Sequence, residues 1–499
     1  MKENPKLYEI NTVVWLDELG QKYGKNTTIG DVPSQEWDRL KHLGFSYVWM
    51  MGVWKRSRAG MEIFRKSPGW PSVEELSESA LPGWTHDDVI GSPYSIASYE
   101  PEPMVGRWED IDKVREELHK RDMRLMLDFV PNHTAPDHPW VFEHPEFYFQ
   151  VSESEYERDP ALYNLVRKGE KIMYLARGKD PYFPAWPDTA QLNYFNPEMR
   201  SAMLDELKNI ARHCDGVRCD MAMLLLTAIF SRNWEWAGKG WFETPSTEFW
   251  EEARSAVPDL TLMAEAYWDT EYSLQQLGFD YVYDKRFYDA LRNSSPREMR
   301  FHLNADSSFQ KRLVRFLENH DEPRSAAAFR GSKLLASVVL LMSTVPGMKL
   351  YYHGQLEGRR IQVPLLLRRV APEEVDEGIK EIYEKILHVA HQKVFSSGTF
   401  ELKDIYGAWD DTHENLISYT WKHGGKTDNI LKLVVVTLSE PGSQGRISLK
   451  GDLREEGDYD LSDEFNDKRF RRIGKEMADP GLHVILDGLH CHVFDISSA

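Results

Sequence analysis

The segment GVRCDMAM at residues 216–223 is typical of a buried strand, except that it carries two charges. Arg218 and Asp220 stand two positions apart, which places them on the same face of an extended chain. Burying such a pair is costly unless the two charges satisfy each other. The segment therefore indicates either a structural salt bridge or a site where a buried charge is used.

Strand-like runs of this kind alternate with charged, amphipathic segments such as 111–122 and 197–214. Alternation of strand and helix predicts parallel βαβ units, and eight such strands predict a (β/α)8 barrel of the TIM type. The eight runs are YEINTVVWL (8–16), FSYVWMMGV (45–53), RLMLDFVPN (124–132), GVRCDMAM (216–223), LTLMAEAYW (260–268), FDYVYD (279–284), RLVRFLENH (312–320) and MKLYYHG (348–354).

The spacing of the charged strand ends predicts an insertion. Asp128 and Asp220 lie 92 positions apart, about twice the 45 positions between Asp220 and Glu265, so we expect a small subdomain after the third strand. After about residue 390, short strands separated by turn residues predict an antiparallel β-sandwich. The predicted domains are a barrel (1–133 and 187–388), an inserted subdomain (134–186) and a C-terminal sandwich (389–499).

Composition excludes several functional classes. The formal charge of −19 argues against nucleic acid or an anionic membrane as a partner. Cys214, Cys219 and Cys491 form neither a disulfide framework nor a zinc motif, and we expect the first two in the core. The most apolar run, 334–347, is interrupted by Ser, Thr and Pro and predicts a buried helix. With no signal-like stretch at the start, we expect a soluble, cytoplasmic protein.

Polar residues end four of the predicted strands, at the rim where a barrel presents its chemistry. One charged strand end is explained by a salt bridge or a helix cap. Several carboxylates on one rim repel one another and raise their pKa values, which proteins tolerate most often where the shifted pKa is used. Two carboxyl groups facing each other across a sugar are the minimum equipment for glycoside hydrolysis.

In chain order, DFVPNH, GVRCDMAM, EAYW and ENHDEP resemble the four strand-end motifs of the α-amylase family, glycoside hydrolase family 13. The resemblance spans about residues 8–360, and AWPDTAQLNYFNPEMR (185–200) is similar to a short family motif near the end of the inserted domain. It implies that Asp220 is the nucleophile, that Glu265 is the general acid/base, and that Asp321 is the third carboxylate, which stabilises the transition state.

The same resemblance implies that Arg218 hydrogen-bonds the nucleophile and that His133 and His320 bind sugar hydroxyls. Tyr94, in GSPYSIASY (91–99), either stacks on the sugar or is a half-buried loop tyrosine. We expect Arg218 to lower the pKa of Asp220 and the neighbouring acids to raise that of Glu265. Retention of configuration is predicted, with the Asp220 and Glu265 carboxyl groups about 5–5.5 Å apart.

Three departures from the family pattern concern specificity and metal binding. Ser95 follows Tyr94, where exo-acting α-glucosidase-like members commonly have aspartate, and this departure disfavours an exo-acting glucosidase. Met223 and Leu224 stand where many α-amylases have a Lys-His pair, so we expect substrate preference to differ there. Asn132 matches a calcium-binding residue, but NHTAPDHPW (132–140) is closer to members that often lack the ion. We expect no required cofactor or metal, with Ca2+ left open.

Three tryptophans in NWEWAGKGWF (233–242) are expected in a loop on the catalytic side. Flat aromatic rings suit the apolar faces of glucose units, although a hydrophobic lid or an interface patch would have the same composition.

The sequence thus predicts an α-amylase-type hydrolase that cleaves α-1,4 links in maltooligosaccharides or in glycogen- and starch-like glucans with retention. A transglycosylase, either a glucanotransferase or a maltosyltransferase, is the alternative, because a sugar can intercept the same covalent intermediate. A non-catalytic binding or assembly relative is disfavoured because Asp220, Glu265 and Asp321 are all present. Endo or exo action, linkage, chain length and oligomeric state stay open.

Overall fold

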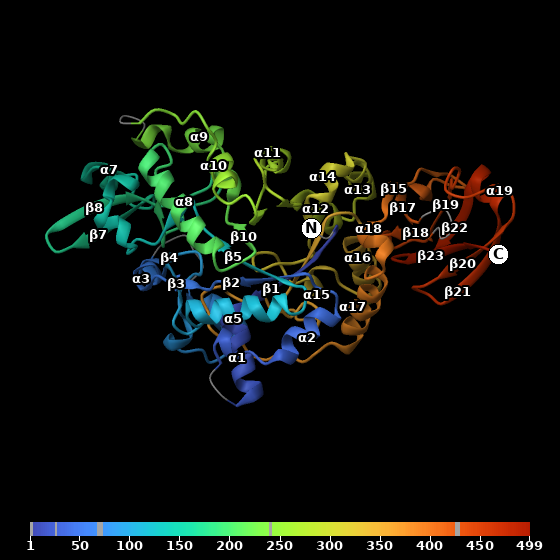
Figure 1. The fold of residues 1–499 in the computed structure, drawn as a ribbon, viewed down its shortest axis with the longest axis horizontal. Helices are drawn as coiled ribbons and strands as arrows, with labels where there is room; N and C mark the ends of the chain where they lie inside the picture. The colour runs from blue at the N-terminus through green and yellow to red at the C-terminus, as the bar shows by residue number, and fades with distance from the viewer. Residues whose placement is uncertain (1–2, 25–26, 67–72, 239–241, 425–429) are drawn as a thin grey trace.

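The computed structural model describes residues 3–24, 27–66, 73–238, 242–424 and 430–499. Eight parallel strands close into a barrel, confirming the predicted (β/α)8 fold (Figure 1). Around the barrel they are β1 (Lys6–Asn11), β2 (Tyr47–Met51), β5 (Arg124–Phe129), β10 (Gly216–Cys219), β11 (Thr261–Ala264), β12 (Tyr281–Tyr283), β13 (Leu313–Arg315) and β14 (Met348–Tyr352).

The first strand is shorter than predicted. β1 ends at Asn11, and the apolar run that follows forms the buried side of helix α1 (Thr12–Tyr23). A short apolar run fits a buried strand and a buried helix equally well, so periodicity alone could not separate the two.

Helices follow the strands and cover the barrel (Figure 1). The segments expected to be helical at 111–122 and 197–214 form α5 (Trp108–His119) and α8 (Pro197–Ala211). Asn196 caps α8 by accepting the backbone N–H of Glu198, and Pro197 occupies the first helical position. The other helices of the barrel are α2 (Ser34–His42), α9 (Thr227–Gly238), α10 (Phe249–Ala256), α11 (Glu271–Gln276), α12 (Lys285–Arg292), α13 (Pro296–Leu303), α14 (Ser307–Lys311), α15 (Ser325–Ala328), α16 (Ser332–Thr344) and α17 (Glu377–Ala390).

Two long insertions follow barrel strands. After β2, the antiparallel pair β3 (Trp54–Arg56) and β4 (Ile96–Pro101) encloses α3 (Arg58–Lys66), α4 (Val73–Ala80) and the short helix η2 (His86–Asp88). After β5, the segment expected as a subdomain holds α6 (Pro139–Glu143), α7 (Glu153–Arg158) and a hairpin of β7 (Tyr163–Lys168) and β8 (Lys171–Ala176). Its ends meet where β6 (His133–Thr134) pairs with β9 (Ala190–Gln191). The hairpin projects from the barrel at the left of Figure 1.

Two antiparallel sheets form the C-terminal part, as predicted, beyond the short helix α18 (Lys393–Ser397). The larger sheet runs β15 (Thr399–Leu402), β17 (Leu416–His423), β18 (Ile430–Thr437), β23 (Cys491–Ser498), β20 (Asp458–Asp463) and β21 (Lys468–Ile473). The smaller sheet runs β16 (Ile405–Tyr406), β19 (Ser443–Ile447) and β22 (Leu482–Leu486), and the short helix α19 (Gly474–Glu476) follows β21.

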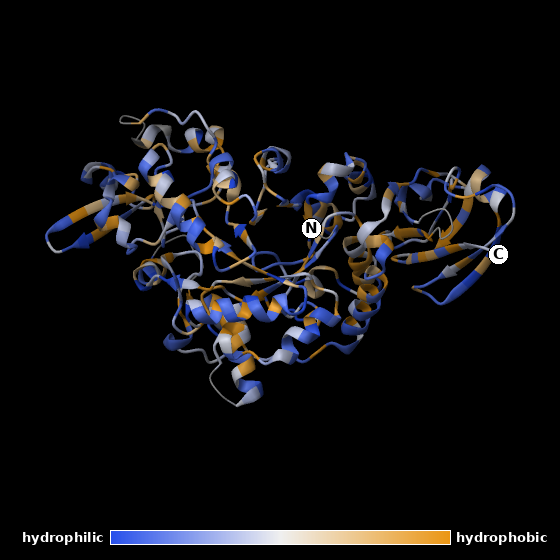
Figure 2. Ribbon diagram, viewed as in Figure 1, coloured by the Kyte–Doolittle hydropathy of each residue, from blue (hydrophilic) through white to orange (hydrophobic). Residues whose placement is uncertain are grey.

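The larger sheet is buried on both faces over its central strands. Leu433 and Val435 of β18 pack with Ile447 of the smaller sheet, whereas the alternate residue Val434 belongs to the core that includes α16. Trp421 Nε1 donates to the Thr344 carbonyl at the end of α16. In Figure 2 the edge strand β21 is mainly hydrophilic, which suits a strand with one unpaired side.

Further expectations about the core are confirmed. Helix α16, the most apolar segment, is buried along most of its length, and Cys214, Cys219 and Cys491 are buried free thiols. In the ranges that the structure describes, no helix combines the length and apolarity needed to cross a membrane.

Candidate active site

A cavity of about 1260 Å³ opens at the carboxyl ends of the barrel strands. It exceeds the ~300–1,000 Å³ of ordinary small-molecule sites, so it can take a ligand of several sugar units. Six of the seven residues predicted for the site line it, and Arg218, the seventh, is completely buried at its base. The six are Tyr94, His133, Asp220, Glu265, His320 and Asp321.

Asp220 and Glu265 are neighbours because of the strand register. Cys219 pairs with Ala264 where β10 lies beside β11, so the next residue of each strand leaves the barrel at the same level. The backbone N–H of Glu265 donates to the Cys219 carbonyl, and that of Asp220 donates to the Phe129 carbonyl. Ladder-like bonds on both sides therefore hold the two carboxylates at adjacent strand ends.

Arg218 contacts both carboxylates. Its Nη1 donates to Asp220 Oδ1 at 2.6 Å, and its Nη2 lies 2.9 Å from Glu265 Oε2. Burial raises the pKa of Asp220; Arg218 lowers it, as expected, but does not outweigh burial, so the net shift is upward. The sequence shows that the cation is near, but not how completely the fold removes the carboxylate from water.

Glu265 has a raised pKa, as expected. Burial raises it to about 7; Arg218 opposes this shift, while Asp220 and Asp321 add to it. Glu265 Oε2 accepts the backbone N–H of Met221 at 2.7 Å, and Oε1 accepts the Tyr267 hydroxyl at 2.9 Å. Tyr267 received no role from the sequence, although EAYW places it two positions beyond the acid.

His320 connects three groups at the mouth of the barrel. Its Nε2 lies 3.0 Å from Asp321 Oδ2 and 2.9 Å from the Tyr94 hydroxyl, and its Nδ1 lies 2.5 Å from Glu9 Oε1. Burial lowers the pKa of His320, but Asp321 and Glu9 outweigh it and raise the pKa to about 10. His320 is therefore a cation at neutral pH. Glu9 received no predicted role, although a charge inside the first strand is the same signal that singled out Asp220.

Asp321 is the most exposed of the three acids, with 44% of its side chain accessible. Burial acts to raise the pKa of Asp321, but His320 and Arg218 lower it by more than burial raises it. The net shift is therefore downward. The exposed carboxylate is ionised at neutral pH and can accept hydrogen bonds from sugar hydroxyls.

His133 and Tyr94 lie beside each other on the cavity wall. His133 Nε2 donates to the Tyr94 carbonyl at 3.2 Å, which leaves Nδ1 to accept from the Asn132 amide. Burial lowers the His133 pKa to about 4, so this imidazole is neutral. The Tyr94 ring stacks on His320 with centroids 5.3 Å apart.

Not every polar strand end belongs to the site. Asp128 accepts hydrogen bonds from Trp49 Nε1 and the Gly52 N–H inside the barrel, and Glu318 pairs with Arg324. Both acids are fully buried and have structural roles.

Met223 and Leu224, where we expect substrate preference to differ from that of other α-amylases, do not line the cavity. Both side chains are buried in the short helix η4 (Ala222–Leu225), away from the lining of the cavity. Met221 faces the cavity instead, and its left-handed backbone (φ 43°) directs its N–H to Glu265. Non-glycine residues adopt this conformation at a cost and often at functional sites.

Two of the three tryptophans expected in a loop belong to helix α9 instead. Trp234 is buried against Phe149, Trp236 is 53% exposed, and Trp241 lies outside the described residues. Trp186 and Trp268 line the cavity in their place.

The surroundings of Asn132 do not fit a calcium site. Its amide group is buried and pairs reciprocally with Gln191, so Oδ1 accepts from Gln191 Nε2 and Nδ2 donates to Gln191 Oε1. A neutral amide pair lacks the carboxylates that calcium prefers. No group of three or more His, Cys, Asp or Glu side chains within the described ranges could hold a metal ion.

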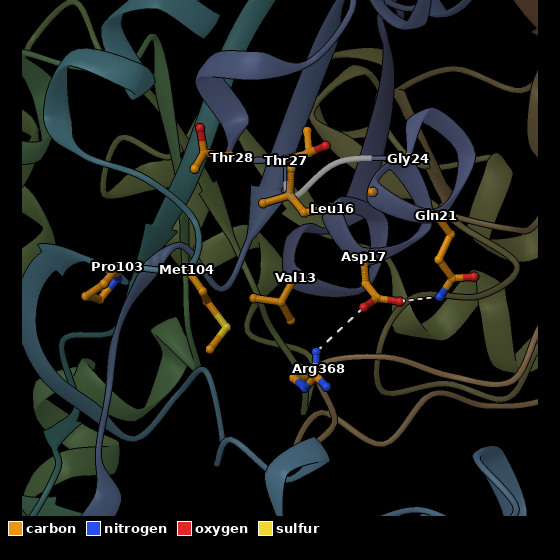
Figure 3. A pocket seen from close by; sticks show the side chains of 11 residues that line it. Val13, Leu16, Asp17, Gln21, Gly24, Thr27, Thr28, Pro103, Met104 and Arg368 are labelled. Carbon is orange, nitrogen blue, oxygen red and sulfur yellow. Dashed lines mark hydrogen bonds and ion pairs between the residues drawn. The ribbon is translucent and has the colours of Figure 1, made fainter.

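A second cavity, of about 680 Å³, lies beside α1 (Figure 3). Among its described lining residues the only carboxylate is Asp17, which contacts Arg368 at 3.7 Å and accepts from Gln21 at 2.6 Å. One paired acid cannot supply the two-carboxylate chemistry of the main cavity.

The main cavity joins three acids and two histidines at the carboxyl ends of a closed (β/α)8 barrel. Two of the acids share one buried guanidinium, and one of these has a pKa near 7. This fold and this set of groups define the class of barrel enzymes that act on glycosidic bonds through paired carboxylates.

Comparison with known proteins identifies the family. The model of the α-amylase catalytic domain matches residues 22–382, and the chain belongs to the α-amylase family. "Alpha-amylase 3" of Dictyoglomus thermophilum is 27% identical over 378 residues, covering 71% of this chain and 64% of that protein. "Alpha-amylase MalA" of Haloarcula japonica is 24% identical over 68% of this chain and 47% of that protein. The chain thus spans less than two thirds of the length of these relatives.

Solved structures share the complete fold. A noncanonic maltogenic α-amylase, AmyB, from Thermotoga neapolitana superposes with a TM-score of 0.68 at 20% identity, covering 99% of both chains. An α-amylase from Geobacillus thermoleovorans complexed with acarbose gives a TM-score of 0.66 at 18% identity, covering 99% of this chain and 98% of that one. The barrel, its insertions and the C-terminal sheets therefore form one known architecture.

Proposed function

We propose that the protein is a retaining α-glucoside hydrolase acting on α-1,4-linked maltooligosaccharides or glycogen- and starch-like glucans. The observation that carries this proposal is the contact of one buried Arg218 with both Asp220 and Glu265. This double contact holds Asp220 as the nucleophile and Glu265 as the acid side by side at adjacent strand ends. Membership of the α-amylase family and the names of the relatives support the substrate class.

In the first step Asp220 attacks the anomeric carbon while Glu265 gives its proton to the departing glycosidic oxygen. The products are a β-glycosyl ester on Asp220 and a sugar with a free hydroxyl. In the second step Glu265 removes a proton from water, the water oxygen attacks the same carbon, and Asp220 leaves as a carboxylate. Two inversions at one carbon give retention. The separation of about 5–5.5 Å between the two carboxyl groups is part of this proposal.

The other lining residues suit the sugar at the cleavage point. His320 supplies a cationic N–H and Asp321 an exposed carboxylate, and both can bind hydroxyls. Neutral His133 and the Tyr94 ring lie on the same side of the cavity. Proton transfer and nucleophilic attack are both provided by carboxylates, so the proposed reaction requires no cofactor or metal.

The charge of the cavity favours a neutral substrate. Four further acids, Asp180, Asp188, Asp289 and Glu322, line it besides the three catalytic candidates. Lys285, the lining lysine, forms ion pairs with Asp289 and Glu322 and is not available for a phosphate. One relative of this chain is a "Trehalose-6-phosphate hydrolase", 28% identical over 27% of this chain. An excess of negative charge repels phosphorylated sugars and leaves neutral glucans as substrates.

A transglycosylase is the second candidate function, and one observation favours it. The rings of Tyr182, which is 64% exposed, and Trp268, which lines the cavity, contact each other with centroids 5.1 Å apart. Trp268 follows Glu265 by three positions, so this aromatic pair stands on the side where the leaving sugar departs. Rings there can hold an acceptor sugar that competes with water.

Incubation with maltoheptaose tests both functions. Hydrolysis gives only shorter sugars by chromatography, transfer gives longer ones as well, and NMR of the first product shows the α-anomer if configuration is retained. Absence of any product, or a β-anomer formed first, would contradict the proposal. The Asp220→Asn variant, incubated in parallel, controls for contaminating activity.

The cytoplasmic location and the absence of nucleic-acid and membrane partners are likewise proposals. The formal charge of −19 and the three buried free thiols support them.

A further inference from the structure

Two segments far apart in the chain join at one end of the main cavity. One is the insertion after β2, which contains α3 and α4, and the other is the loop at 361–371 after β14. Phe64 of α3, Leu76 of α4 and Leu366 of the loop belong to one apolar cluster and also line the cavity. We call these three side chains the apolar wall.

Backbone and ionic contacts bind the two segments together. The N–H of Ile90 donates to the Leu366 carbonyl at 2.8 Å, and the N–H of Arg368 donates to the Asp88 carbonyl at 2.9 Å. The Asp88 side chain is completely buried and accepts from Arg369 Nε at 2.6 Å. These contacts fix the loop at 361–371 to residues 88–90 of the insertion.

Barrel topology places the apolar wall opposite the acid. The two segments follow β2 and β14, the two neighbours of β1, whereas Glu265 follows β11, which stands four strands from β1 in either direction around the barrel. A general acid must lie beside the leaving group. The wall therefore stands on the other side, where the glycone part of the substrate lies.

The wall also stands close to the sugar at the cleavage point. Gln362 Nε2 donates to the Asp321 carbonyl at 2.9 Å, and Leu365 and Tyr94 both pack against the apolar core inside the barrel. On α3, a Cβ added at Gly60 would lie 2.5 Å from Ser95 Oγ, so this helix touches the residue that follows Tyr94.

Gln362, which contacts Asp321, and Leu366 of the wall are four positions apart in one loop, at most about 14 Å along an extended chain, so little length is left for a glycone chain between this sugar and the wall. The three side chains of the wall have no groups that hydrogen-bond sugar hydroxyls. Ser95 stands where exo-acting members commonly have aspartate. Its side chain is buried and donates to the Asp188 carbonyl, so its identity does not decide between exo and endo action.

Building on the proposed function, we infer that this enzyme is exo-acting: it takes glucan chains by their non-reducing end, and the apolar wall stops the glycone after a mono- or disaccharide. The enzyme then releases one short product of constant size from substrates of different length.

Two forms of 4-nitrophenyl maltoheptaoside test this inference, one free and one blocked at its non-reducing end by a 4,6-ethylidene group. The expected result is cleavage of the free substrate at least about tenfold faster than the blocked one, with one short sugar in the first products. Equal cleavage of both substrates would overturn the inference and leave the proposed function intact. Cleavage of neither would overturn the proposed function and the inference with it.

Variants of the wall provide the second measurement. The double variant Phe64→Ala/Leu76→Ala changes two half-buried positions of the wall. It should raise the ratio of the cleavage rate of the blocked substrate to that of the free substrate by about tenfold. Glu78→Ala, at an exposed position of α4, is the matched control and should leave the ratio unchanged. If the double variant still failed to cleave the blocked substrate, residues other than the apolar wall would limit the length of the glycone.

Discussion

Arg218 holds Glu265 as well as the neighbouring Asp220: its Nη2 lies 2.9 Å from Glu265 Oε2, while its Nη1 donates to Asp220 Oδ1. One buried cation balances only one of two buried carboxylates, so a proton on the other one is favoured near neutral pH. The direct hydrogen bond favours ionised Asp220, and the pKa of about 7 favours the proton on Glu265. In the proposed mechanism, the free enzyme thus already separates the nucleophile from the acid.

Replacing the proposed nucleophile tests this division of roles. Asp220→Asn should lower kcat on maltoheptaose at least about a thousandfold, because an amide does not form the glycosyl ester. Thermal unfolding should show an intact fold. Asp205→Asn, at an exposed position of α8, is the control and should retain full activity. Near-normal turnover of Asp220→Asn would refute the assignment.

The pKa of Glu265 predicts the pH dependence of activity. An acid with a pKa of about 7 is active when protonated, so kcat/KM should fall as the pH rises above about 7. Tyr267→Phe removes a hydrogen bond that stabilises the carboxylate, so the pKa should rise further, by roughly 0.5–1 unit. The alkaline limb of the kcat/KM profile should then move to higher pH.

Tyr272→Phe, at a position of α11 that is 62% exposed, controls for the loss of a hydroxyl group. A Tyr267→Phe profile that is unchanged, or displaced to lower pH, would contradict the proposed hydrogen bond.

The buried pair of Glu9 and His320 predicts a pH-dependent stability. Although burial lowers the His320 pKa, Asp321 and Glu9 together raise it from its ordinary value of 6.5 to about 10, so the stabilisation is complete below pH 6.5 and is lost as the pH rises through 10. Glu9→Gln should lower the free energy of unfolding by about 3–5 kcal/mol at pH 6. Denaturation by urea should show this difference shrinking toward pH 10. A difference in the free energy of unfolding that stayed constant between pH 6 and 10 would contradict this prediction. Glu62→Gln, at an exposed position of α3, provides the control.

The hydrogen bond between Asp88 and Arg369 joins the two segments of the apolar wall, and its removal should weaken their contact. The pKa of Asp88 is lowered to about 2, chiefly by the hydrogen bond from Arg369, so its stabilisation is present above pH 4 and is lost as the pH falls through 2. Asp88→Asn should cost about 1–3 kcal/mol at neutral pH and speed hydrogen exchange in 85–90 and 366–371. Asp87→Asn, at the exposed neighbouring position, should leave exchange unchanged. Protection at the wild-type level in both variants would show that Asp88 does not hold the segments together.

Local sequence patterns were enough to predict the barrel strands and most of the residues at their carboxyl ends. All eight strands were predicted, because each one is an apolar run whose alternation with helices is visible in a short window. The boundary of the first strand was wrong, since its apolar run continues into α1. The loop expected at 233–242 is helical over residues 233–238, because the packing of Trp234 against Phe149 leaves no local sign in the sequence.

For the site, the chain by itself determined which residues could act: Asp220, Glu265 and Asp321 stand at strand ends, and the closure of a barrel brings strand ends together. Only the tertiary structure decided how those residues behave. The upward shift of the Asp220 pKa, the cation on His320 and the place of the apolar wall depend on burial and on contacts between residues hundreds of positions apart. Desolvation and ion pairing act through distances in space, and these exist only once the chain has folded.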